Sequence, residues 1–267
     1  MIDWWKALIL GLVQGVTEFL PVSSSGHLLL TRELLGLEEI GLAFDIFLHV
    51  GTVIAVCAVL WRQIINVFKH PKQLVFVIIA SIPAAVAGFL LNDYVESVFV
   101  SARWLWVLFL ITAILLLVTD ILGKKIAQDK ITKLGYGNVA VMGLWQAAAI
   151  VPGLSRSGTT ICAGVLSGAK RDEVANFSFI MSIPVILGAA AYQALKILKG
   201  EVAVSLASPD IISIVLGVIV SSVSGFFVIK FMLKLIRQCN LKWFSLYLGV
   251  LALLLFVNFV ILPKPLF

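Results

Sequence analysis

Three ionisable side chains lie inside otherwise apolar stretches of the chain, and they are the first candidates for chemistry. They are Glu18 and His27 in "TEFLPVSSSGHLLL" (17–30) and Arg156 in "PGLSRSGTT" (152–160). An ionisable group at membrane depth is costly, so it marks a functional site by default. A planar guanidinium binds two phosphate oxygens at once, and the serines beside Arg156 add hydroxyl donors. The pattern therefore favours a site for a phosphate-bearing ligand.

Glu18 and Ser24 offer the remaining parts of phosphoryl transfer. Glu18 follows Gln14 by four residues, so both side chains share one face of a helix. A carboxylate repels phosphate unless a hard divalent cation bridges them, so we expect Glu18 to hold Mg²⁺ or Ca²⁺. Ser24 and His27 are three residues apart, a spacing that could join a hydroxyl to an imidazole, with Glu18 as base or as orienter of His27. The residues alone leave open which group attacks.

Two broken helices must hold these groups. Pro21 ends a helix over 4–19, and the serines at 23–25 can cap a second half-helix that begins near residue 26. A second loop has the same arrangement: Pro152 is followed by "SRSG" and by a half-helix that runs to about residue 167. Half-helix N-termini present free N–H groups and positive dipole ends, which suit an anion.

The composition predicts a membrane protein. Of 267 residues, 61% are hydrophobic and 13% charged, and the mean hydropathy is +1.10. The net charge of +6 does not imply nucleic-acid binding, because in a membrane protein the location of the basic residues matters more than their sum. No polar linker separates the apolar runs, so we predict one integral membrane domain over 1–267. Runs long enough to span a bilayer lie near 42–61, 74–91, 103–122, 175–195, 211–229 and 243–262.

Basic residues predict the orientation. Thirteen of them fall in alternate connections, which should be cytoplasmic, so that both termini face outward. This topology is possible only if residues 4–31 enter the membrane from outside and return to the same side, and residues 137–168 enter from inside and return. Both segments would then be re-entrant. The thirteen are Arg62, Lys69, Lys72, Lys124, Lys125, Lys130, Lys133, Lys170, Arg171, Lys230, Lys234, Arg237 and Lys242.

The two re-entrant segments resemble each other. "GLVQGVTEFLPVSSSG" (11–26) and "GLWQAAAIVPGLSRSG" (143–158) share six residues at a constant offset of 132. A second echo, "SIP", occurs at 81–83 and at 182–184. Inverted repeats bring broken helices together near the bilayer midplane, where they line a cavity.

We therefore predict an all-α polytopic fold. It has six transmembrane helices plus two re-entrant helix-loop-helix hairpins, arranged as an inverted-topology repeat. The first repeat covers about 1–122 and the second about 137–262.

Several polar side chains have simpler explanations. Ser23 and Ser25 could be helix caps or close-packing contacts. His49 follows Asp45 by four residues, which favours a local pair between them. Asp120 sits at the end of a predicted span, and we expect it to be solvated.

With "QGVTEFLPVSSSGH" (14–27) and "PGLSRSGTT" (152–160) the chain resembles the undecaprenyl-diphosphate phosphatase family, the bacitracin-resistance type of bacterial envelope enzyme. The resemblance extends to "FDIFLHVGTVIAV" (44–56) and "EVANFSFIMSIP" (173–184). It implies a membrane hydrolase that converts undecaprenyl diphosphate to undecaprenyl phosphate plus inorganic phosphate. The lipid carrier is thereby recycled for peptidoglycan synthesis, and bacitracin resistance follows.

The resemblance also assigns residues. Many members carry two glutamates in the acidic motif, whereas this chain has Gln14 and so offers one carboxylate, Glu18, as metal ligand. The catalytic set is Glu18, Ser24, His27 and Arg156. The substrate-binding set is Gln14, Ser23, Ser25, Gly26, Ser155, Ser157, Gly158 and Thr160.

The resemblance further implies a bacterial inner-membrane location, a pocket that opens outward, a divalent-metal requirement and homodimers. A lipid-phosphate transporter or flippase is the competing interpretation, because inverted repeats with broken helices are transporter architecture. An intramembrane serine protease would explain the hydroxyl groups but leaves Arg156 and Glu18 without a role.

Overall fold

The computed structural model describes residues 3–37, 42–99, 101–129, 132–199, 211–237 and 241–262, and within these ranges the chain is helical with no β-sheet. Lys130 and both chain ends lie outside the described residues. The helices are α1 (Trp4–Thr17), α2 (Ser24–Leu34), α3 (Leu42–Lys69), α4 (Pro71–Phe99), η1 (Ala102–Trp104), α5 (Leu105–Asp129), α6 (Tyr136–Ala148), α7 (Arg156–Leu166), α8 (Arg171–Leu198), α9 (Ile211–Arg237), α10 (Lys242–Phe256) and η2 (Val257–Ile261).

Six segments are long and apolar enough to cross a membrane, which confirms the six predicted spans. Their outer faces carry large apolar side chains that a soluble protein would bury, such as Phe89 (73% exposed) and Phe227 (65% exposed). The protein is therefore a multi-pass integral membrane protein. The segments are Phe44–Lys69, Pro71–Leu91, Ala102–Ile126, Arg171–Lys196, Ile211–Ile236 and Lys242–Ile261.

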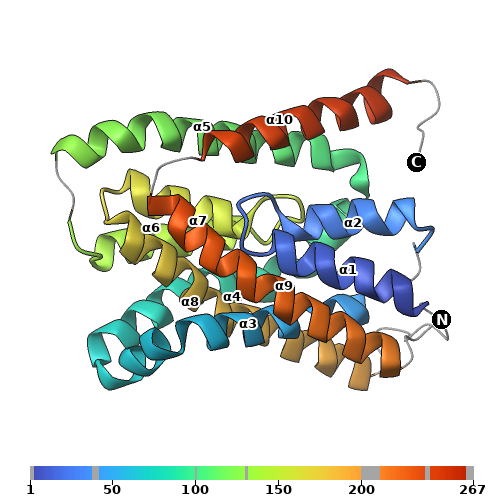
Figure 1. Cartoon of the computed structure of the whole chain (residues 1–267), viewed down its shortest axis with the longest axis horizontal. Coiled ribbons are helices and arrows are strands. Elements are labelled where there is room, and N and C mark those ends of the chain that lie inside the picture. The colour runs from blue at the N-terminus through green and yellow to red at the C-terminus, as the bar shows by residue number, and fades with distance from the viewer. Residues whose placement is uncertain are drawn as a thin grey trace.

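Two helix-loop-helix hairpins, α1–α2 and α6–α7, complete the fold. Their helices are short: α1 has 14 residues and α7 has 11. At 1.5 Å per residue they are about 21 and 16 Å long, which is less than the ~30 Å of a bilayer core. Figure 1 shows the blue loop after α1 and the yellow loop before α7 near the middle of the molecule. These lengths agree with the expected half-helices, and re-entry into the membrane stays a prediction.

Helices from the first half of the chain pack against helices from the second half, in reciprocal pairs. The first helix of the chain, α1, packs on α9, and α6 packs on α4, so that each hairpin lies against a helix from the other half. The helix pairs α3–α8 and α5–α10 also join the two halves, and Figure 1 shows α5 and α10 together along the top. An exchange of this kind is what the predicted two-fold repeat would produce. The repeat limits near 1–122 and 137–262 stay predictions.

Two glycines at the predicted offset make equivalent close contacts. A Cβ on Gly11 would lie 2.6 Å from the carbonyl oxygen of Gly217 in α9. A Cβ on Gly143 would lie 2.9 Å from the Cα of Ala80 in α4. The two hairpins therefore approach their partner helices backbone to backbone, as small residues allow in membrane proteins.

The "SIP" echo does not follow the repeat. Pro83 lies in α4, the fourth helix of the first half, whereas Pro184 lies in α8, the third of the second half. The two tripeptides are therefore not at equivalent positions, and the expectation that they mark the repeat was wrong.

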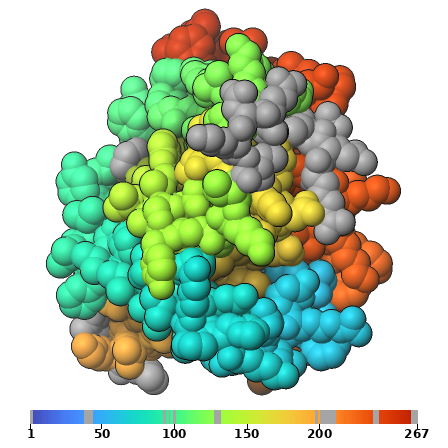
Figure 2. All heavy atoms as spheres, turned by 90° about the vertical axis from the view of Figure 1, so that its left-hand side faces the viewer, coloured from blue at the N-terminus to red at the C-terminus, as the bar shows by residue number. Residues whose placement is uncertain are grey.

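Two segments that carry or follow predicted cytoplasmic connections, the starts of α4 and α6, meet at one end of the molecule. Lys72, at the start of α4, sits 5.8 Å from the ring of Tyr136, at the start of α6. Figure 2 views this end, where the cyan turn between α3 and α4 lies beside the yellow-green start of α6. Which side of the membrane this end faces stays a prediction.

Candidate active site

The loops of the two hairpins bind each other directly. The backbone N–H of Gly153 donates to Oγ of Ser25 at 3.2 Å, and Oγ of Ser157 donates to the carbonyl of Leu20 at 2.8 Å. Each loop thus uses a serine to hold the backbone of the other. Residues more than 120 positions apart in the sequence are joined at this contact.

Serines also start the two half-helices that leave the loops. Oγ of Ser23 accepts from the backbone N–H of Gly26 at 3.4 Å and caps α2. Oγ of Ser155 accepts from the N–H of Gly158 at 3.0 Å and caps α7. These caps satisfy N–H groups of each first turn and direct both helix N-termini toward the loop contact.

Glu18 is the centre of the site. Its Oε2 accepts hydrogen bonds from Oγ of Ser24 at 2.5 Å and from Nε2 of Gln14 at 2.9 Å, and its Oε1 pairs with Nη2 of Arg156. The side chain is only 5% exposed, so the guanidinium and two further donors compensate a buried charge. The end of α1 and the starts of α2 and α7 supply these groups.

Two buried atoms beside this centre have no hydrogen-bond partner. One is Nη1 of Arg156, and the other is the amide oxygen of Gln14. Buried polar groups are nearly always satisfied, so each points to a ligand atom. The guanidinium donor suits a phosphate oxygen, and the amide oxygen beside Glu18 suits a cation.

Ser24 and His27 do not form the pair that their spacing suggested. The Ser24 hydroxyl donates to Glu18, whereas the His27 ring lies 2.8 Å (Nδ1) from the carbonyl of Ser23 and 2.7 Å (Nε2) from the hydroxyl of Tyr247. Ser23 has φ +71°, the one positive φ at a non-glycine residue in the described part of the chain. Strained backbone of this kind is concentrated at functional sites.

Aromatic rings from two spans enclose His27. The ring of Phe109, in α5, lies 5.4 Å from the imidazole, and the ring of Tyr247, in α10, lies 5.7 Å from it and nearly parallel. Neither contact was predictable, because both aromatic residues stand in ordinary apolar runs.

His49 also belongs to the site and was missed. Its Nε2 lies 3.6 Å from Oε2 of Glu18, and its Nδ1 lies 2.7 Å from the backbone carbonyl of Asp45. The expected local pair with Asp45 thus forms through the backbone, while the Asp45 carboxylate pairs with Arg32 of α2 at 2.9 Å. A histidine within a span was the available signal.

Thr160 and Asp120 have packing roles. The Thr160 hydroxyl lies 2.7 Å from the hydroxyl of Ser178, which ties α7 to α8. Asp120 is 4% exposed and accepts from the N–H of Leu241 at 3.1 Å and from Nζ of Lys124 at 2.8 Å. The expectation that Asp120 is solvated was wrong, because its carboxylate fastens the start of α10 to α5.

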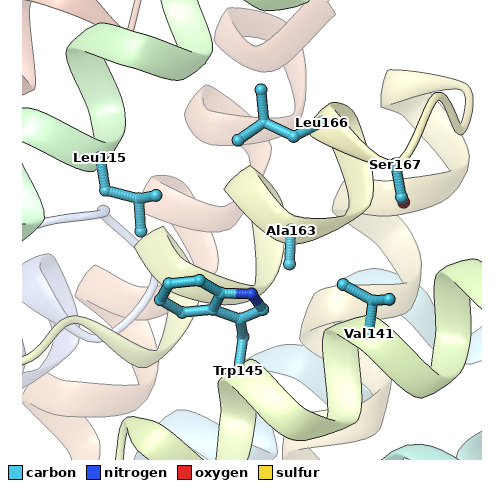
Figure 3. A pocket seen from close by; sticks show the side chains of 6 residues that line it. All are labelled: Leu115, Val141, Trp145, Ala163, Leu166 and Ser167. Atoms are coloured by element: carbon cyan, nitrogen blue, oxygen red, sulfur yellow. The ribbon is translucent and has the colours of Figure 1, made fainter.

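A cavity of about 220 Å³ lies apart from these groups, between α5, α6 and α7. Figure 3 shows Trp145 of α6 facing Leu115 of α5 and Ala163 of α7. Its lining is apolar except for one serine and holds no charged side chain, so it does not suit a phosphate group. The lining residues are Leu115, Val141, Trp145, Ala163, Leu166 and Ser167.

Comparison with known proteins agrees with the loop motifs. A family model described as bacitracin resistance protein BacA matches residues 7–254. An undecaprenyl-diphosphatase of Carboxydothermus hydrogenoformans is 37% identical over 255 residues, which cover 95% of this chain and 96% of that protein. Proteins of the same name from Thermodesulfovibrio yellowstonii (38% over 261 residues; 96% and 98% covered) and Bacteroides thetaiotaomicron (36% over 268 residues; 96% and 99% covered) are also similar. The chain therefore belongs to the bacitracin resistance protein BacA family.

Proposed function

We propose that this chain hydrolyses undecaprenyl diphosphate to undecaprenyl phosphate and inorganic phosphate. The lipid carrier is thereby recycled for peptidoglycan and other envelope polymers, and resistance to bacitracin follows. One observation carries the proposal: Arg156, Glu18 and Ser24 meet in a single hydrogen-bonded group where the two loops touch. The names of the relatives support the same reaction.

Arg156 binds the diphosphate. Nη2 of Arg156 is held by Glu18, which leaves the unpartnered Nη1 for a phosphate oxygen. The N-termini of α2 and α7 add two positive dipole ends directed at the same place. The isoprenyl chain leaves the site sideways between spans and remains in the lipid.

Ser24 is the nucleophile. Its Oγ attacks the terminal phosphorus, its proton passes to Oε2 of Glu18 at 2.5 Å, and the bond to the bridging oxygen breaks. Undecaprenyl phosphate leaves. Water then attacks the phosphoserine, Ser24 takes back the proton from Glu18, and Nε2 of His27 accepts the proton of the attacking water.

Glu18 and the amide oxygen of Gln14 would hold a divalent cation, Mg²⁺ or Ca²⁺. In the described part of the chain no three His, Cys, Asp or Glu side chains converge. One carboxylate and one amide oxygen suit a hard ion that takes its other ligands from phosphate and water. When bound, the ion neutralises charge on the phosphate oxygens.

The protein acts in the bacterial inner membrane, with the site open to the outer face and both termini outside. The segregation of basic residues and the family's envelope role support this placement. A homodimer stays a prediction.

Phosphate release by purified protein tests the function. In detergent, where two compartments do not exist, the wild type should release phosphate from undecaprenyl diphosphate. Arg156→Lys keeps the charge but cannot bind Glu18 and phosphate with two parallel donors, so its turnover should fall about 100-fold. Arg103→Lys, on the exposed 3₁₀ turn η1, is the matched control. Substrate binding without turnover by the wild type would favour a transporter instead.

A further inference from the structure

Both nitrogens of His27 have a defined partner, and this determines where its proton lies. The carbonyl of Ser23 can only accept, so Nδ1 of His27 carries the hydrogen. In the neutral ring Nε2 is then an acceptor, and the hydroxyl of Tyr247 donates to it at 2.7 Å. The neutral tautomer is therefore held at both ends.

The packing of α10 on α5 places Tyr247 at this position. Ser245 lies two residues before Tyr247 in α10. Its Oγ donates to the carbonyl of Ala113 in α5 at 2.7 Å. Phe109 lies one turn before Ala113 on α5, and its ring lies 5.4 Å from the imidazole. The register of α5 and α10 therefore determines the positions of both aromatic rings that contact His27.

We propose that Tyr247 is a positioning residue for the phosphatase reaction. Its hydroxyl holds His27 in the neutral tautomer until the reaction, when the attacking water replaces this hydroxyl at the single Nε2 lone pair and delivers its proton. Because a phenol hydroxyl both donates and accepts, it can restore the contact after Nε2 is protonated, now as acceptor. The inference rests on the proposed function, since it requires His27 to take the proton of the attacking water.

No other titratable group competes for this role among the contacts that the structure gives the ring. Phe109 approaches from α5 and Tyr247 from α10, and Ser23 belongs to the loop itself. Arg32, further along α2, pairs with Asp45 of α3, and the two charges at the loop contact, Glu18 and Arg156, pair with each other.

Tyr247→Phe tests the proposal, because it removes the hydroxyl and leaves the ring. We expect kcat to fall about tenfold, the effect of one positioning hydrogen bond, with KM within about twofold. The acidic limb of the pH–rate profile should move to higher pH, because the bond that favours neutral His27 is lost. Tyr136→Phe, at the exposed start of α6, is the matched control.

A second measurement does not depend on turnover. Diethyl pyrocarbonate modifies neutral imidazole, and mass spectrometry can follow His27 separately from the exposed His70 as internal reference. In Tyr247→Phe the free Nε2 lone pair should make modification of His27 severalfold faster, with His70 unchanged.

An unchanged acidic limb together with unchanged His27 reactivity would overturn the proposal, even if kcat fell. Absence of phosphate release by the wild type would instead refute the proposed function. The modification rates would still report whether Tyr247 holds His27, so the two failures can be told apart.

Discussion

Arg156 and Glu18 form an ion pair across 138 residues of sequence, and this pair joins the two hairpins. The side chains are 15% and 5% exposed, so each charge depends on the other for compensation. The pair therefore has two functions: it holds the loops together, and it directs one free guanidinium nitrogen to the space where a phosphate would bind.

Ser24→Ala should abolish phosphate release, by about 10³-fold or more, because the nucleophile is lost. Ser222→Ala, which removes a hydroxyl bonded within α9, should leave the rate unchanged. Labelled substrate should give a phosphoenzyme that survives acid, as phosphoserine does. An acid-labile adduct, typical of phosphohistidine, would transfer the nucleophilic role to His27.

His49→Ala should lower kcat about tenfold, because it removes the imidazole whose Nε2 lies 3.6 Å from Oε2 of Glu18. His49→Gln supplies an amide at the same depth and should restore most of the rate. A wild-type rate in His49→Ala, measured in the same detergent, would mean that the contact is incidental to the reaction.

A chelator should stop phosphate release, and Mg²⁺ or Ca²⁺ should restore it. Gln14→Glu places a second carboxylate beside Glu18, so half-maximal activation should need severalfold less cation. A titration of phosphate release against free Mg²⁺ measures this. Full activity after exhaustive chelation would show that the reaction needs no divalent cation.

Asp120→Ala should lower the free energy of unfolding by about 1–2 kcal/mol, because the buried N–H of Leu241 loses its acceptor. Asp120→Asn keeps an oxygen for that N–H and loses only the pair with the half-exposed Lys124, which contributes little. The thermal midpoint in detergent should therefore fall for alanine and hold for asparagine. Equal midpoints for both variants would contradict the capping role.

Local features of the sequence were sufficient to predict the six spans and the family. Span length and apolarity are properties of consecutive residues, and the motifs around Glu18 and Arg156 are continuous. The serine caps of α2 and α7 were predictable for the same reason.

Contacts between distant helices were not predictable from such patterns. Tyr247 reaches His27 across 220 residues, and its position depends on how α10 packs on α5. Ser24 bonds to Glu18 instead of His27, because the strained Ser23 directs the ring elsewhere. Asp120 was predicted to be solvated, because the sequence at the end of a span does not show that the start of another helix packs against that residue.

A double-mutant cycle of Glu18 and Arg156 measures whether the two hairpins build one active site. The mild variants Glu18→Asp and Arg156→Lys keep both charges, so kcat/KM for phosphate release should stay measurable. Residues that act as one unit are not additive, so the double variant should lose much less than the product of the two single losses. Losses that multiply would show that the two loops act independently and do not form one active site.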